Sequence, residues 1–215
     1  FISYLGPEMD KLGVSVFMGT VEKGNPKLVD SVLNAAESGK YIKGAGFQWD
    51  GKLAIPTIHA EHPALTVYQT EHECGNGLND WAYAKYSWTL LDHYLKNGVT
   101  AYQYWNLSLP VGGKSTWGWY QNSLITVDQT NKTYTWNNEY YLMKHFSHYV
   151  QPGAAYLKGS PDEKNVIAFE NPDKSIAVIV YNDSNADKTI RIKIGDHTIA
   201  PLFKAESFNT LLFKR

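Results

Sequence analysis

The sequence has almost no cysteine and no excess of charge of either sign. Cys74 is the single cysteine in 215 residues, which excludes an internal disulfide and any zinc site built from several cysteines. The net charge of -1 gives no electrostatic footprint for nucleic acid. No apolar run approaches the roughly 18–20 residues that a membrane-spanning helix needs. A signal peptide is absent and the first residue is Phe1, so we expect a processed protein or a fragment.

Tryptophan is absent after position 136, although the chain contains seven of them. The pattern of residues also changes near Pro152, where short β-branched runs separated by turn signals replace longer mixed segments. Hydrophobic residues make up 43% and charged residues 19%, which is typical of a globular protein. We therefore predict two domains, over residues 1–150 and 151–215.

The first domain alternates between two kinds of segment. Apolar runs of strand length lie at 14–20, 41–52, 65–71 and 99–109, and apolar residues at helical spacing lie at 26–39 and 79–98. Asn79 or Asp80 is the expected N-cap of the second helix, and Gly98 follows its end. Strands separated by helices predict βα units and a parallel sheet. The second domain, with runs at 165–171, 175–182, 188–194 and 207–214, predicts an antiparallel β-sandwich.

Three strands of the first domain end in aromatic, amide or carboxylate side chains. The strand ends read "FQWDG", "YQTEHE" and "YQYWNLS". Functional groups gather at the carboxyl ends of parallel strands, so these side chains are expected on one rim. Aromatic faces suit the apolar face of a pyranose, and amides and carboxylates suit its hydroxyls. A carbohydrate site is therefore predicted, with these candidate residues: Gln48, Trp49, Asp50, Glu71, Tyr104, Trp105 and Asn106.

Two glutamates lie two positions apart at the end of the strand at 65–71. Glycoside hydrolysis requires two carboxyl groups across the scissile bond. In a regular strand Glu71 and Glu73 share one face, roughly 6.6–6.8 Å apart along the strand, and His72 points to the other. Side-by-side carboxylates make a poor catalytic pair. We expect at most one of them to be catalytic, with its partner on another strand.

Longer motifs extend this interpretation. "YIKGAGFQWDGK", "QTEHECGNGLNDW", "YQYWNLSLPVGGKSTWGWYQNSLITVD" and "YYLMKHFSHYVQPGA" resemble glycoside hydrolase family 30, the glucosylceramidase-like enzymes. The resemblance implies an α/β fold, namely the second half of a (β/α)8 TIM barrel followed by an antiparallel β-sandwich. It implies a retaining glycosidase that needs no metal or organic cofactor. The nucleophile carried over from the family is Glu71, which follows Thr70 at the end of the seventh strand.

The resemblance begins just before the fifth strand of the barrel. The acid/base of the family is a glutamate after an asparagine at the end of the fourth strand, so the expected partner is the N-terminal half of the same protein. Asn138–Glu139 has the right letters but lies past the last barrel strand, and we interpret Glu139 as a charge at a helix N-terminus. Asp50 occupies a position where relatives can have a tyrosine. The substrate preference of those relatives therefore does not transfer directly to this chain.

Simpler structural roles account for several other residues. Glu73 fits a supporting role, His72 should point away from the barrel axis, and Cys74 fits a partly buried thiol. Three adjacent residues cannot easily surround one tetrahedral ion, so no metal site is predicted there. The seven-residue spacing of Trp81 and Trp88 is typical of a helix core. By contrast, a loop that holds two tryptophans favours a sugar-facing wall made by Trp117 and Trp119.

The sequence thus predicts a retaining β-glycosidase acting on β-glucosides, either glucosylceramide-like molecules or β-glucans. The alternatives are a non-catalytic carbohydrate-binding protein, an incomplete fragment, or an endo-β-1,6-glucanase or xylan-type hydrolase of the same family. The sandwich lacks tryptophan and so offers no obvious stacking platform. The sugar, the mode of cleavage and the oligomeric state stay open. So does the compartment, with an extracytoplasmic one slightly favoured.

Overall fold

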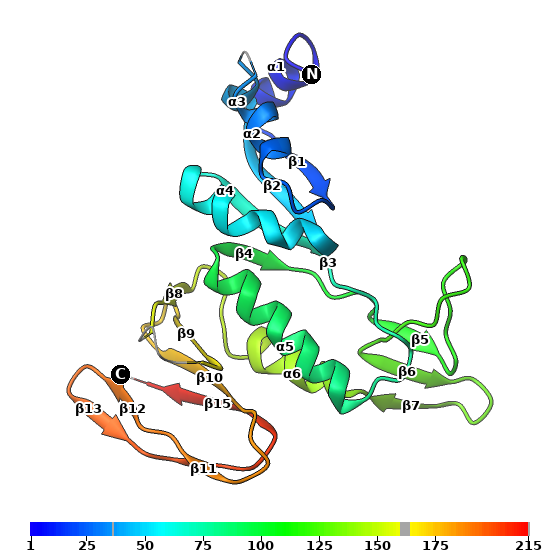
Figure 1. Ribbon diagram of the computed structural model, residues 1–215, viewed down its shortest axis with the longest axis vertical. Helices are drawn as coiled ribbons and strands as arrows, with labels where there is room; N and C mark the ends of the chain where they lie inside the picture. Colours follow the sequence, from blue (N-terminus) through cyan, green and yellow to red (C-terminus); the bar gives the residue numbers. More distant parts are fainter. Residues whose placement is uncertain (36, 160–163, 215) are drawn as a thin grey trace. The chain divides into compact units, whose positions relative to one another are not determined.

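The computed structural model describes residues 1–35, 37–159 and 164–214. The chain forms two compact units, which divide between Asn137 and Asn138 (Figure 1). The predicted domain limit between residues 150 and 151 therefore stays a prediction. None of the helices in the described part of the chain is long and apolar enough to cross a membrane.

A four-stranded parallel sheet forms the centre of the first unit. Its order is β1-β2-β3-β4. The strands are β1 (Val16–Val21), β2 (Ile42–Gln48), β3 (Thr66–Glu71) and β4 (Val99–Tyr102). Each expected strand is present, and the parallel order confirms the predicted βα arrangement. Within the described residues, β1 and β4 each have a neighbour on one side only.

Helices connect these strands. They are α1 (Leu5–Lys11), α2 (Lys27–Leu33), α3 (Ser38–Tyr41), the 3-10 helix η1 (Trp49–Ala54), α4 (Ile55–Glu61) and α5 (Trp81–Lys96). The single helix predicted over 26–39 is wrong, because α2 ends at Leu33 and α3 starts after Glu37, whose φ of 62° breaks the helix. Gly39 lies inside α3 instead of ending a helix, and Ala36 lies outside the described residues. The patterns described above did not predict η1 and α4.

Helices α4 and α5 cover one face of the parallel sheet with apolar side chains. Every second residue of β2 and β3 faces this layer, as the alternation of a strand requires. The core contains Ala45, Phe47, Val67, Ile55, Ile58, Leu90 and Tyr94. Burial of one such large side chain contributes about 1.5–3 kcal/mol. The sheet is therefore anchored on its helix side, which leaves its other face to form a site.

Helix α5 begins and ends where the sequence indicates. The carboxylate of Asp80 accepts a hydrogen bond from the backbone N–H of Tyr83 at 2.9 Å, which identifies the N-cap. Gly98 has a φ of +82° directly after the C-cap residue Asn97. Trp88 is buried in the core as predicted, whereas Trp81 is half-buried.

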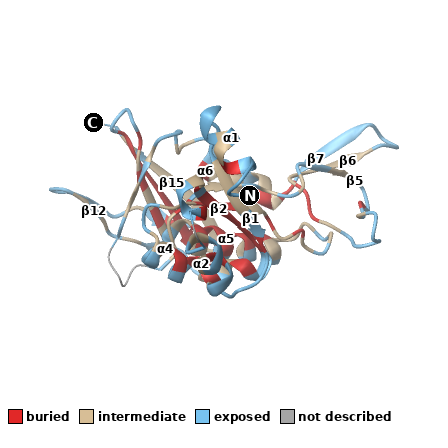
Figure 2. Ribbon diagram, turned by 90° about the horizontal axis from the view of Figure 1, so that it is seen from above, coloured by how far each residue is buried: buried red, intermediate tan, exposed pale blue. Residues whose placement is uncertain are grey.

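A small sheet follows β4. Its strands β5 (Ser108–Pro110), β6 (Ile125–Asp128) and β7 (Thr133–Trp136) lie in that order. The carboxylate of Asp128 accepts backbone hydrogen bonds from Thr130 and Asn131 at 2.9 Å, which closes the β6–β7 hairpin. The strand predicted over 99–109 is therefore two strands, because β4 ends at Tyr102 and β5 begins at Ser108. Figure 2 colours β7 as exposed, whereas β6 has intermediate burial.

The second unit is a helix and an antiparallel sheet. It contains α6 (Asn138–Ser147) and the sheet β15-β10-β9-β8, made of β8 (Ala155–Leu157), β9 (Val166–Glu170), β10 (Ile176–Asn182) and β15 (Ser207–Phe213). Two short pairs complete it: β11 (Lys188–Thr189) with β14 (Leu202–Phe203), and β12 (Ile192–Ile194) with β13 (His197–Ile199). All of β10 is buried. The antiparallel strands expected over 165–171, 175–182 and 207–214 are confirmed, whereas the run at 188–194 is two strands, β11 and β12, which pair with different partners.

Candidate active site

A β-bulge at the end of β3 sets the direction of Glu71. Phe47 of β2 pairs with Gln69, but the next residue, Gln48, pairs with Glu71, so Thr70 is an extra residue in the ladder. Phe47 belongs to the core under the helices, and Gln48 therefore faces the opposite side of the sheet. Glu71 shares that side because it is the partner of Gln48. Without the bulge, strict alternation from the buried Gln69 would turn Glu71 toward the helices.

The face opposite the helices contains a hollow of about 460 Å³ at the carboxyl ends of β1, β2 and β3. Glu71 is half-buried at its edge. A Cβ at Gly46 would lie 2.5 Å from the Thr70 Cγ2 atom, so the Thr70 methyl group leaves no room for a side chain at this position. The lining residues are Phe17, Met18, Gly19, Thr20, Gly46, Gln48, Tyr68, Thr70 and Glu71.

The hollow combines an aromatic floor with polar groups. The rings of Phe17 and Tyr68 are stacked, with centroids 4.6 Å apart. The hydroxyls of Thr20 and Thr70 are hydrogen-bonded to each other. The Gln48 side-chain amide donates to a carboxylate oxygen of Glu22 at 2.5 Å. A ring, hydroxyls, an amide and a carboxylate on one concave surface are chemically suited to a sugar.

His72 lies directly behind Glu71, against α5. Its Nδ1 is hydrogen-bonded to the Tyr102 hydroxyl at 2.5 Å and its Nε2 to the Ser87 hydroxyl at 3.2 Å. The ring of Tyr104 stacks on the imidazole, with centroids 4.4 Å apart. Burial lowers the pKa of His72 to about 3, so the imidazole is neutral at ordinary pH. The prediction that His72 points away from the barrel axis is confirmed, and sugar binding by Tyr104 stays a prediction.

Glu73 belongs to a different set of contacts from Glu71. One carboxylate oxygen forms an ion pair with Lys52 of η1 at 2.8 Å, and the other accepts from the Tyr86 hydroxyl of α5 at 2.6 Å. Burial and the bond to Glu73 raise the pKa of Tyr86. Glu73 thus joins η1 to α5, which agrees with the supporting role expected for it.

Two predicted substrate residues lie just past the end of β2, at the start of η1. Trp49 has a φ of 47°, and 37% of its surface is exposed. The Asp50 side chain is 80% exposed, with an oxygen 4.0 Å from the Lys52 ammonium. Neither residue lines the hollow beside Glu71, whereas Gln48 does. Their contact with a substrate stays a prediction.

The remaining predicted residues follow β4. Trp105 is exposed, and the side-chain amide of Asn106 donates to the Gln121 side-chain oxygen at 3.1 Å. Asn106 therefore holds the loop that carries Trp117 and Trp119. The rings of these two tryptophans are exposed and lie 6.0 Å apart at an angle of 33°. None of these four residues lines the hollow, and their role in binding stays a prediction.

Sequence reasoning missed the contribution of β1. Thr20 lines the hollow, and Glu22 holds the Gln48 amide just after the strand ends. The signal was present, since polar and acidic residues follow this strand too, in "GTVEK". Tyr68 and Thr70 were missed because their face of β3 could not be assigned before the pairing was known.

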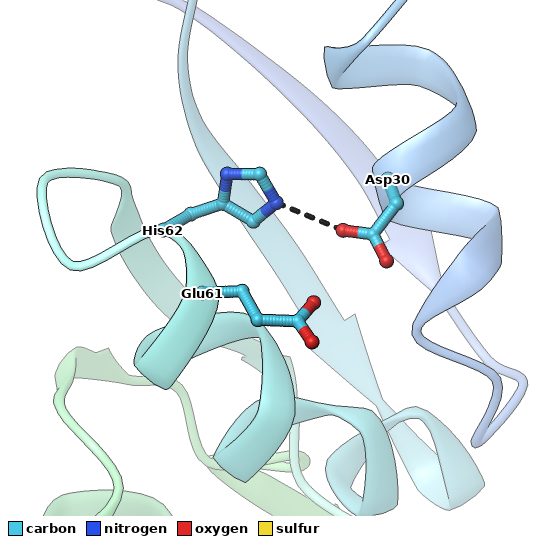
Figure 3. A group of neighbouring side chains, drawn as sticks. All are labelled: Asp30, Glu61 and His62. Atoms are coloured by element: carbon cyan, nitrogen blue, oxygen red, sulfur yellow. Dashed lines mark hydrogen bonds and ion pairs between the residues drawn. The ribbon is translucent and has the colours of Figure 1, made fainter.

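One group of side chains in the described part of the chain could share a metal ion, and it lies among the helices. Asp30 of α2, with Glu61 and His62 at the end of α4, bring ligand atoms within 4.8 Å of one another (Figure 3). The His62 Nε2 and an Asp30 carboxylate oxygen already pair at 2.8 Å. This pair links α2 to the end of α4, and none of its residues lines the hollow at Glu71.

Comparison with known proteins identifies the family. Residues 9–150 match the glycosyl hydrolase family 30 TIM-barrel domain, and residues 156–211 match the β-sandwich domain of the same family. The chain belongs to glycosyl hydrolase family 30. This confirms the resemblance and the fold: part of a TIM barrel followed by a β-sandwich.

Two curated relatives show how much of a family 30 protein the chain covers. It is 27% identical over 205 residues to "Putative glucosylceramidase 1" of Caenorhabditis elegans, covering 87% of the chain and 38% of the relative. It is 26% identical over 224 residues to endo-1,6-beta-D-glucanase neg1 of Aspergillus fumigatus, covering 90% and 42%. The chain therefore spans about two fifths of the length of these relatives.

Solved structures share the fold over the whole chain. SrfJ from Salmonella typhimurium has a TM-score of 0.85 at 24% identity, covering 100% of this chain and 51% of that one. The endo-β1,6-glucanase BT3312 has a TM-score of 0.82 at 21% identity, covering 98% and 51%. The chain thus corresponds to about half of each of these longer proteins.

Proposed function

We propose that this chain supplies the nucleophile half of a retaining β-glycosidase. The observation that carries the proposal is the bulge in β3, which places the Glu71 carboxylate beside a sugar-sized hollow on the face of the sheet away from the helices. Membership of a glycosyl hydrolase family supports the reaction class. Catalytic groups of a TIM barrel lie at the carboxyl ends of its strands, where Glu71 lies.

The proposed reaction has two steps. Glu71 attacks the anomeric carbon and forms a glycosyl–enzyme intermediate, while an acid protonates the leaving oxygen. The same acid group, now a base, activates the water that releases the sugar. It belongs to the N-terminal half of the protein, about 5–5.5 Å from the nucleophile as retention requires.

The other rim residues bind the sugar in this proposal. Gln48, Asp50 and Asn106 hold hydroxyls, and Tyr68 provides an aromatic surface in the hollow. Four tryptophans and one tyrosine at the rim form the walls: Trp49, Trp105, Trp117, Trp119 and Tyr104. β-Glucosides are the proposed substrate class, because relatives are named as a glucosylceramidase and an endo-1,6-β-glucanase.

A mechanism-based label tests the nucleophile. The complete barrel is incubated with an activated 2-deoxy-2-fluoro-β-glucoside, which traps the glycosyl–enzyme intermediate, and the labelled peptide is sequenced by mass spectrometry. We expect the label on Glu71, no label in the Glu71→Gln variant, and labelling retained in Glu73→Gln. A label on another residue contradicts the assignment. Sugar binding without label or turnover favours the alternative, a non-catalytic carbohydrate-binding protein.

A further inference from the structure

His72 follows the proposed nucleophile Glu71, and both its backbone and its side chain form hydrogen bonds to neighbouring elements. The backbone N–H of His72 donates to the Gln103 carbonyl oxygen at 2.9 Å, which continues the β3–β4 pairing one step beyond the end of β3. Both ring nitrogens are hydrogen-bonded, and they reach two different elements, Tyr102 of β4 and Ser87 of α5. Tyr104 covers the face of the ring.

These contacts occur where the strand itself offers little support. The ladder between β2 and β3 loses its register at Thr70, and β3 ends at Glu71. A residue next to a bulge can turn its side chain toward either face unless the following residue is fixed. His72 is the following residue, and its imidazole is 1% exposed.

The geometry points to His72 as a positioning residue for the proposed nucleophile: its imidazole ties the end of β3 to β4 and α5 and so fixes the direction of the Glu71 side chain. This inference rests on the proposed function. His72 does not line the hollow and is not a catalytic residue.

The hydrogen-bond pattern explains why a histidine suits this position. Burial raises the pKa of Tyr102 well above its usual value, so its hydroxyl keeps its proton and can donate to Nδ1. Nε2–H can then donate to the Ser87 hydroxyl. Phenylalanine would fill the same space without either bond, whereas asparagine or glutamine could restore one of them. This difference separates positioning from packing.

The experiment uses the complete barrel and compares His72→Phe, His72→Asn and His72→Gln. The matched control is His145→Phe in the second unit, a half-buried histidine with one ring hydrogen bond, to Thr210 at 2.8 Å. Readouts are kcat, KM and the rate of trapping by the fluoro-sugar. We expect His72→Phe to lower kcat and the trapping rate about 10–100-fold with KM nearly unchanged. His72→Asn or His72→Gln should recover most of the loss, and His145→Phe should change neither rate.

Two results overturn the inference: an unchanged trapping rate in His72→Phe, or an equal loss in all three His72 variants. If His72→Phe does not fold, Tyr102→Phe and Ser87→Ala each remove one bond and should each slow trapping by a few fold. Unchanged trapping in both then overturns the inference. Failure of the proposed function is distinct, because it appears as a wild-type protein with no label on Glu71.

Discussion

The end of β3 and the whole of β10 pair with their neighbours in opposite ways. β10 pairs with β15 through seven consecutive residues, Ile176 to Asn182, without a shift. β3 pairs with β2 through four residues and then slips by one at Thr70. Every residue of the regular strand β10 is buried. At the irregular end of β3, by contrast, the half-buried carboxylate of Glu71 lines a hollow. The slip between β2 and β3 thus occurs at the part of this molecule that we assign to chemistry.

The largest expected effect is a loss of kcat at Glu71 in the parallel sheet, with Glu170 in the antiparallel sheet as the comparison. Glu71→Gln should lower kcat by about four orders of magnitude or more, because an amide cannot form the covalent intermediate. Glu170→Gln in β9 makes the same chemical change at a residue paired with Lys174 on the antiparallel sheet and should leave kcat unchanged. Steady-state kinetics of the complete enzyme measures both. Equal losses would remove the functional contrast between the two sheets.

A second prediction concerns the backbone beside the bulge. Gly46→Ala should destabilise the protein by about 1–3 kcal/mol and lower activity, because the added Cβ lies 2.5 Å from the Thr70 Cγ2 atom. Val180→Ala in β10 should cost about 2–4 kcal/mol through the cavity it leaves, with no loss of kcat in the folded enzyme. Denaturant unfolding and kinetics on the same samples test the pair. A Gly46→Ala enzyme with normal kcat would show that the bulge tolerates displacement.

The third prediction is a pH dependence of stability. The folded protein keeps His72 neutral down to a pKa of about 3, whereas the unfolded chain takes up a proton near 6.5. Stability from this group is therefore complete above pH 6.5 and falls by a few kcal/mol as the pH drops toward 3. The tyrosines that face the ring are Tyr83, Tyr102 and Tyr104, and burial raises the pKa of Tyr102 still further above this range.

Unfolding curves of wild type and His72→Asn between pH 7 and 4 measure this slope. The variant should show a flatter dependence. Burial also lowers the pKa of His145 in the second unit, so His145→Asn serves as the comparison and should flatten the curve less. Identical slopes for wild type and His72→Asn would contradict the buried, neutral imidazole.

The smallest expected effect concerns ion pairs on the two units. Asp30 and His62 pair at 2.8 Å between helices of the first unit, and Asp187 and Lys204 pair at 2.8 Å in the second. The first pair is partly exposed, so a double-mutant cycle should give a coupling energy of about 0–1 kcal/mol for it, and the more exposed second pair should give a smaller one. A much larger value for the Asp30–His62 pair would indicate that α2 depends on it for its position.

The strands were predictable from sequence because their signals are local. Runs of β-branched and apolar residues placed β1, β2 and β3 within a few residues and gave the start of β4, and Asp80 marked the start of α5. The bulge at Thr70 could not be predicted, because a register shift depends on the pairing of two strands that are separate in sequence. The assignment of Glu71 as nucleophile came from the family resemblance. The alternation of side chains predicts which face of the sheet Glu71 is on only if the strand is regular, and β3 is not.

Other misses have equally specific causes. The helix expected over 26–39 ends at Leu33, and a separate helix starts after Glu37, whose left-handed backbone has no sequence signal comparable to glycine. The strand expected over 99–109 stops at Tyr102, because the apolar letters of Trp105 and Leu107 belong to exposed side chains. In the sequence, exposed aromatic and apolar residues cannot be distinguished from the apolar residues of a buried strand, because burial depends on the surrounding structure.

The edge strands β1 and β4 of the parallel sheet affect how this protein can be produced. In the described structure each has a strand on one side only, and the stacked rings of Phe17 and Tyr68 line the hollow on the same sheet. Bare strand edges beside apolar surface recruit whatever strands they meet. We therefore expect these two edges to promote aggregation when this chain is produced by itself.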